Sequence, residues 1–140
     1  MDQYRRTFLK TLYLAGPING CSDGEANDWR TEVKERLSDC YEFLDPMRHD
    51  YRGKEMEPGI AEKIVGNDMQ DIYSSDVILA NCSKPSAGTS MEIYHAFDQL
   101  DKPVIVVAPA PISPWIKRFS TFQCTNLGAA ITYLRTTAKR

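Results

Sequence analysis

Residues 76–108, DVILANCSKPSAGTSMEIYHAFDQLDKPVIVVA, carry the pattern that decides the fold. The runs at 76–80 and 103–108 are almost continuously apolar, which is typical of parallel strands that are buried on both faces. Between them, a polar turn rich in small residues leads into a helix expected at 90–100. A strand, a helix and another strand in this order predict two strands of one parallel sheet.

The same alternation continues on both sides of this segment. Short apolar runs end at turn-forming residues, and apolar residues recur at helical spacing between them. We expect strands at 11–15 and 41–44, helices at 25–37 and 59–73, loops at 47–57 and 109–114, and a final helix capped by Thr125 or Asn126 that runs to about Leu134. This pattern predicts an α/β fold with helices on both faces of a parallel sheet of about five strands.

Length and composition limit the class of protein. With 140 residues the chain has the size of one domain, and 42% hydrophobic residues are enough for one core. The net charge of −2 provides no basic face for nucleic acid, and no apolar stretch approaches the roughly 18 residues of a membrane span. The N-terminus lacks the apolar run of a signal peptide. We therefore expect a single cytoplasmic domain, 1–140, that binds neither nucleic acid nor membrane.

The cysteines and histidines argue against a metal site. Four cysteines are scattered along the chain without a CxxC pair, and there are only two histidines. Zinc sites bring such ligands together at short, characteristic spacings. We therefore expect no bound metal and four reduced thiols.

The segments that follow the strands form the expected ligand site. In parallel α/β sheets, ligands bind beyond the carboxyl ends of the strands, near the point where the strand order reverses. The segments in that position are 16–20, 45–53, 81–92 and 109–115. The first of them, GPING, is neither a GxGxxG nor a GxxxxGK[ST] sequence, which disfavours dinucleotide dehydrogenases and P-loop NTPases.

Glu92 has two interpretations from the local sequence. Residues 83–92, SKPSAGTSME, follow a buried strand and enter a helix, so their backbone N–H groups form a site for an anion or a hydroxyl group. In the first interpretation, Glu92 is a catalytic group that lies in the first helical turn and points into the same crevice. Alternatively, Thr89 and Glu92 form a capping box with a structural role. The local sequence fits both interpretations.

Asp68 and Asp71 lie three residues apart on the preceding helix and therefore on one face of it. They form either a solvated acidic surface or part of the same crevice as Glu92. Two carboxylates that meet at one crevice suit glycosyl chemistry, because one attacks the anomeric carbon and the other supplies a proton to the leaving group.

Several motifs together resemble the nucleoside 2-deoxyribosyltransferase family, which includes the 2'-deoxynucleoside 5'-monophosphate N-glycosidases. They are YLAGPING at 13–20, WR at 29–30, DPMRHDYRG at 45–53, NDMQDI at 67–72, SDVILAN at 75–81 and GTSMEI at 88–93, in the order of the family. The resemblance covers roughly residues 13–107. It implies a flavodoxin-like (Rossmann-like) three-layer sandwich, a small nucleoside or nucleotide substrate, and no metal or organic cofactor.

The resemblance also implies roles for individual residues. Glu92 is implied as the nucleophile that attacks C1' and forms a glycosyl-enzyme intermediate, which water or a second base then attacks with overall retention. Asp68 is implied to handle the proton of the departing base, and Tyr13 to orient Glu92. The implied substrate-binding residues are Gly16, Ile18, Asn19, Gly20, Asp45, Met47, Arg52, Asp71, Ser86, Gly88, Thr89 and Ser113.

Ser86 departs from the pattern of the nucleoside transferases. Those enzymes commonly carry a carboxylate at this position, six residues before the nucleophile, where it holds the sugar 5'-hydroxyl, whereas the monophosphate glycosidases carry serine. A serine beside helix N–H groups donates to a phosphate, and a carboxylate repels one. Ser86 therefore favours a nucleoside 5'-monophosphate as substrate, with Asn19, Arg52 or Ser113 as further donors.

Several alternatives stay open from the sequence. Transfer to a second base and hydrolysis by water are not separated, nor are the base and the sugar that the protein prefers. In relatives a neighbouring subunit completes the sugar site, so a homodimer or larger homo-oligomer is expected, with Trp115 as an interface or a core residue. A protein of another class, which binds or sequesters a nucleotide or an ADP-ribose-type ligand without turnover, also fits this fold.

Overall fold

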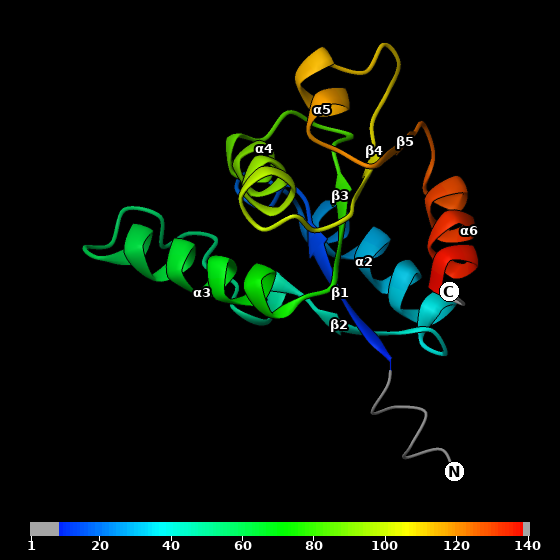
Figure 1. Cartoon of the computed structure of the whole chain (residues 1–140). Coiled ribbons are helices and arrows are strands. Elements are labelled where there is room, and N and C mark those ends of the chain that lie inside the picture. Colours follow the sequence, from blue (N-terminus) through cyan, green and yellow to red (C-terminus); the bar gives the residue numbers. More distant parts are fainter. Residues whose placement is uncertain (1–8, 139–140) are drawn as a thin grey trace.

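A five-stranded parallel sheet forms the middle layer of the computed structural model, which describes residues 9–138 (Figure 1). The strand order is β2-β1-β3-β4-β5, so the order reverses between β1 and β3. This is the flavodoxin-like order, and it confirms the predicted α/β sandwich. The strands are β1 (Lys10–Ala15), β2 (Tyr41–Leu44), β3 (Val77–Asn81), β4 (Val104–Val107) and β5 (Phe122–Cys124).

Two pairs of helices form the outer layers. They are α2 (Asp23–Leu37) with α6 (Leu127–Ala138), and α3 (Ile60–Ser74) with α4 (Ala87–Tyr94). The first pair covers one face of the sheet and the second pair the other (Figure 1). Successive side chains of a strand point to opposite faces, so each face has its own core. In β1, Leu12 and Leu14 pack toward α2 and α6, whereas Tyr13 and Ala15 pack toward α3 and α4.

Short elements complete the fold. A 3-10 helix, η1 (Pro46–Arg48), follows β2, and a π-helix, η2 (His95–Gln99), continues α4. The sequence did not predict α5 (Pro114–Arg118) or the position of β5. Because α5 has five residues and β5 has three half-buried ones, neither is long enough to show a periodic pattern.

The helix after β3 begins three residues earlier than predicted. Ser86 is its N-cap, because the Oγ of Ser86 accepts a hydrogen bond from the backbone N–H of Thr89 at 3.2 Å. The alternative interpretation, in which Thr89 and Glu92 form a capping box, is therefore wrong. Either hydroxyl suits an N-cap by residue type. Thr89 instead lies buried inside the first turn, so the chain uses Ser86.

Local caps account for the starts of the other long helices. Ser22 and Glu25 form a capping box at the start of α2, with hydrogen bonds of 3.0 and 3.2 Å, which places this start two residues before the predicted one. Gly59 precedes α3 with a φ of 78°, a conformation that favours glycine. Of the two predicted caps of the last helix, Thr125 and Asn126, the chain uses Asn126, whose Oδ1 accepts from the N–H of Ala129 at 2.8 Å.

Membrane spans, a signal peptide and disulfides are features of the whole chain. Among residues 9–138, every helix is too short or too polar to cross a membrane. Residues 1–8, on which the prediction about a signal peptide falls, lie outside the described residues. All four cysteines lie inside them, and none is in a disulfide.

The buried side chain of Arg30 ties α2 to the end of β1. Its guanidinium is 1% exposed and donates to the carbonyls of Leu14 and Gly16 at 3.3 and 3.2 Å. It also lies 3.5 Å from Asp45, just after β2, and 4.6 Å from the ring centroid of Trp29. A buried cation is costly unless such partners surround it. These contacts hold the ends of two neighbouring strands in one arrangement.

Replacing Arg30 with Met should destabilise the protein by about 3 kcal/mol, because buried carbonyls and Asp45 lose a charged donor. Urea unfolding measures this free energy. The half-exposed Arg36, which pairs with Glu32 on the same helix, provides the control. Arg36→Met should cost less than about 0.5 kcal/mol. Equal losses in the two variants would contradict the bridging role of Arg30.

Candidate active site

Glu92 and Tyr13 form the centre of the candidate site. Glu92 lies in the second turn of α4 rather than in the first, because the helix begins at Ala87. Tyr13 is fully buried in β1 and donates its hydroxyl hydrogen to Oε2 of Glu92. The two residues meet because β1 pairs with β3, which α4 follows. The partner of Glu92 is thus a tertiary one and not the helix terminus.

Burial controls the ionisation of Glu92. Desolvation raises the pKa of its carboxyl to about 7, although the hydrogen bond from Tyr13 acts in the opposite direction. The charge of Asp68 raises the pKa of Glu92 further, and that of Arg30 lowers it. Burial, and then the charge of Glu92, raises the pKa of the Tyr13 hydroxyl, so Tyr13 stays a donor. A carboxyl with a pKa near neutrality, placed beside the strand-order reversal, is a strong candidate for catalysis.

Asp68 and Asp71 do not form a solvated acidic surface, so that alternative is wrong. Asp71 is buried and pairs with Arg48 of η1 at 3.1 Å. Asp68 is half-buried, and desolvation, followed by the charge of Asp71, raises the pKa of Asp68 to about 6. Since Asp68 also acts on the pKa of Glu92, the two carboxyls share one electrostatic environment.

The turn after β1 packs tightly at its start and opens to solvent at its end. Gly16 is buried, and a Cβ at this position would lie 2.6 Å from Cζ2 of Trp29. Only glycine therefore lets the turn lie directly on α2. Ile18 is half-buried, and Asn19 and Gly20 are exposed. Of the predicted residues in this turn, the last two are accessible to a ligand.

The predicted residues of the loop after β2 have internal partners. Asp45 is buried, pairs with Lys34 at 2.6 Å, and caps η1 by accepting from the N–H of Met47 at 2.8 Å. Arg52 pairs with Asp23 at the start of α2 at 2.7 Å. These contacts fasten the loop to α2, so the charges of Asp45 and Arg52 are already engaged within the protein.

A cavity of ≈ 690 Å³, which we call the larger cavity, lies between α4 and α5. Three of the predicted residues, Ser86, Thr89 and Ser113, are in its wall, and Gly88 is exposed nearby in the sequence. Thr89 is 2% exposed, and its Oγ1 has no hydrogen-bond partner among the described residues. Buried hydroxyls are nearly always hydrogen-bonded, so Thr89 is unusual among the described residues.

The larger cavity also has an apolar side. Met91, Tyr94 and Trp115 lie in its wall and are among the exposed large hydrophobic residues. Trp115 is 76% exposed, so the alternative that it is a core residue is wrong.

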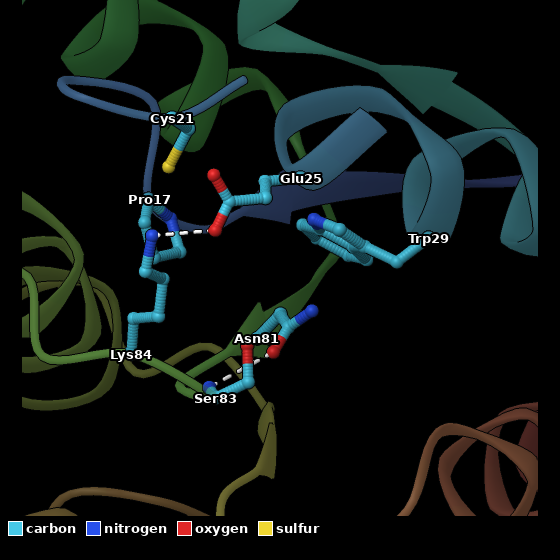
Figure 2. Close-up of a pocket in the computed structure, with 7 residues that line it drawn as sticks. All are labelled: Pro17, Cys21, Glu25, Trp29, Asn81, Ser83 and Lys84. Atoms are coloured by element: carbon cyan, nitrogen blue, oxygen red, sulfur yellow. Dashed lines mark hydrogen bonds and ion pairs between the residues drawn. The ribbon is translucent and has the colours of Figure 1, made fainter. Parts of the chain in front are cut away.

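A cavity of ≈ 240 Å³, which we call the smaller cavity, lies at the carboxyl ends of β1 and β3 (Figure 2). The side chain of Lys84 reaches across one side of it to Glu25 of α2, at 2.6 Å. Lys84 and Ser83 line both cavities. Neither wall includes Glu92 or Asp68, so neither cavity contains the carboxyl pair.

Sequence reasoning did not single out Arg30, Arg48 or Lys84. The sequence does carry a signal for Arg30, because it is four residues after Ala26 and three before Val33, on the buried stripe of α2. Arg48 and Lys84 carry no such signal, since their partners lie on other elements far along the chain.

The start of α4 offers several hydrogen-bonding groups. Hydroxyls and backbone N–H groups gather at the start of α4. Within residues 9–138, no group of three or more His, Cys, Asp or Glu is arranged to hold a metal ion. The arrangement suits an organic ligand with several acceptor oxygens.

The sheet order and the carboxyl pair define a flavodoxin-like α/β protein with two carboxyls of raised pKa near the strand-order reversal. A sequence model of the nucleoside 2-deoxyribosyltransferase family matches residues 12–114. The chain belongs to this family, and at this level its function is glycosyl transfer on small nucleoside substrates. No curated protein sequence matches the chain.

Solved structures of similar fold include two enzymes. The 2-deoxyribosyltransferase of Bacillus psychrosaccharolyticus has a TM-score of 0.71 at 18% identity, covering 91% of this chain and 95% of its own. The CMP N-glycosidase BcmB of Clostridium botulinum has a TM-score of 0.59 at 16% identity, covering 91% and 99%. A conserved protein from Enterococcus faecalis V583 has a TM-score of 0.72 at 13% identity, covering 92% and 99%. At these identities the likeness shows the fold.

Glu92→Gln should stabilise the protein at pH 8.5 by up to about 3 kcal/mol relative to wild type, and by much less at pH 5. The folded-state pKa of Glu92 is raised from 4.5 to about 7, so the stability that goes with the protonated form is present below pH 4.5 and lost as the pH rises through 7. The amide of the Glu92→Gln variant is neutral at every pH, so the variant keeps this stability at pH 8.5.

Urea unfolding at the two pH values measures this difference. Glu35→Gln, at an exposed position of α2, is the control and should show no such dependence on pH. A Glu92→Gln variant that is equally stable relative to wild type at both pH values would show that burial does not raise the pKa of Glu92.

Proposed function

We propose that the protein cleaves the N-glycosidic bond of a 2'-deoxynucleoside 5'-monophosphate, with Glu92 as the nucleophile and water or a second base as the acceptor. The observation that carries this proposal is the hydrogen bond between Tyr13 and Glu92, beside Asp68, at the point where the strand order reverses. Two carboxyls with raised pKa values supply a nucleophile and a proton donor.

The reaction has two steps. Ionised Glu92 forms a bond to C1' while the C1'–N bond breaks and its electron pair goes to the base, which takes a proton from Asp68. Tyr13 binds Oε2 of Glu92 and so leaves Oε1 to attack. Water or a second base then attacks C1', which releases the Glu92 carboxylate and returns a proton to Asp68. Two inversions at C1' give overall retention.

The start of α4 supports a 5'-phosphate on the substrate. Ser86 caps the helix, and the buried hydroxyl of Thr89 has no partner among the described residues. Together with the N–H groups of the first turn, the Ser86 hydroxyl donates to a phosphate, and Ser113 lies in the same cavity wall. Among the described residues of that wall there is no carboxylate to repel the phosphate.

The proposal includes assembly into a homodimer or larger homo-oligomer in the cytoplasm. Met91, Tyr94 and Trp115 expose apolar area beside the phosphate-binding hydroxyls. Aromatic residues and Met are enriched in protein interfaces, and a second copy at this surface would cover them.

Base release from deoxynucleosides and their 5'-monophosphates, followed by chromatography with and without a second base, tests the proposal. Wild type should release base from monophosphates, and Glu92→Ala should lower the rate at least about 10³-fold, because the nucleophile is lost. Glu35→Gln, which removes an exposed carboxylate, is the control and should keep the wild-type rate.

The acceptor separates the two reaction types. Release without a second base identifies a hydrolase, and exchange only in its presence identifies a transferase. If wild type binds nucleotides and releases no base from any of them, the protein is a binding module and the proposal is wrong.

Ser86→Asp should lower the ratio of kcat/KM for the monophosphate to that for the matching deoxynucleoside at least tenfold, because a carboxylate beside the phosphate repels it; like charges brought together cost roughly several kcal/mol. Asp and Asn both cap helices as well as Ser, so the start of α4 is kept. Ser86→Asn is therefore the matched neutral control. Equal ratios in the Asp and Asn variants would place the phosphate elsewhere.

A further inference from the structure

Lys84 occupies a position between the two cavities. It lies in the loop that joins β3 to α4, two residues before the N-cap Ser86. Among the described residues it is the one charged side chain in the wall of the larger cavity, and it also lines the smaller cavity. In Figure 2 its side chain leaves the loop and ends at Glu25 of α2. The ammonium is thus directed away from the hydroxyls at the start of α4.

The ion pair that holds Lys84 is easily broken. Its N···O distance is 2.6 Å, but the side chains of Lys84 and Glu25 are 49% and 46% exposed. Ion pairs this exposed contribute roughly 0–1 kcal/mol. Glu25 keeps a second partner when Lys84 leaves, because its Oε1 accepts from the N–H of Ser22 in the capping box. The start of α2 therefore does not depend on the ion pair.

Other cations near the site are engaged more firmly. Arg30 is buried between carbonyls and Asp45, Arg48 pairs with the buried Asp71, and Arg52 bridges two carboxylates. A phosphate at the start of α4 carries nearly two negative charges at neutral pH, since its second pKa is about 6. Lys84 has a flexible stem and a compact charge, which lets the ammonium change partners.

We propose that Lys84 is the residue that sets the preference for a phosphorylated substrate, by moving its ammonium from Glu25 to the 5'-phosphate. This rests on the proposed position of the phosphate at the start of α4. Glu25 acts as the resting partner, so the ion pair competes with substrate binding. Glu25 and Lys84 therefore have opposite effects on affinity for the phosphate, although they form one ion pair.

Affinities measured in the Glu92→Gln background, where turnover is blocked, test the proposal. Titration calorimetry gives the Kd for a deoxynucleoside 5'-monophosphate and for the matching deoxynucleoside. Lys84→Gln should lower the preference for the monophosphate about tenfold, because a charge-assisted hydrogen bond is lost. Glu25→Gln should raise it severalfold, because Lys84 is released. Gln at position 25 still fits the capping box, so α2 is kept.

Arg36→Gln is the matched control. Arg36 is 49% exposed, like Lys84, and pairs with a carboxylate on α2 away from both cavities. It should leave the preference unchanged. If the ion pair only fastens the loop to α2, Lys84→Gln and Glu25→Gln will change the affinities in the same direction. That result, or an equal effect of Lys84→Gln on both ligands, overturns the proposal.

The catalytic proposal fails separately. Wild type that releases no base, together with opposite effects of the two variants on phosphate preference, would leave the role of Lys84 standing and remove the proposed reaction. Base release by wild type, with no change of phosphate preference in either variant, would leave the proposed reaction standing and remove the role of Lys84.

Discussion

The buried guanidinium of Arg30 is the contact on which the arrangement of the site depends. It donates to carbonyls at the end of β1 and lies beside Asp45 at the end of β2, so it fixes two neighbouring strand ends against α2. Gly16 lets the turn after β1 approach α2 closely enough for this. The same positive charge opposes the raised pKa of Glu92. One buried residue therefore links packing of the sheet to electrostatics of the site.

The carboxyl pair is costly for folding. Glu92 and Asp68 are held where desolvation raises their pKa values. The charge of Asp68 raises the pKa of Glu92 further, and the charge of Asp71 raises that of Asp68. Tyr13 offsets part of this cost for Glu92. A site that favours the protonated form near neutral pH gives up stability for reactivity, which is a common exchange in enzymes. Arg48 and Asp71 bring the loop after β2 against the same helix that carries Asp68.

Acidic residues at the N-terminus of α2 form ion pairs with two loops, one after β2 and one after β3. These acidic residues also suit the positive end of the helix dipole. Asp23 pairs with Arg52 of the loop after β2, and Glu25 pairs with Lys84 of the loop after β3. Both pairs join segments that follow different strands. These two ion pairs, Asp23–Arg52 and Glu25–Lys84, involve exposed or half-buried side chains and break at low cost. The buried core beneath them is much harder to disrupt.

The sequence by itself determined the four long helices, the first four strands and the family, but not α5 or β5. Apolar runs such as 76–80 and helical spacing in 25–37 indicate whether a segment forms a strand or a helix. The family motifs implied that Tyr13, Asp68 and Glu92 share one site. The tertiary structure decided the rest. Ser86 and Thr89 are equally good caps by residue type, and only burial of Thr89 selects Ser86. The partners of Arg30, Arg48 and Lys84 come from other elements, and local periodicity contains no information about pairs that the strand order brings together.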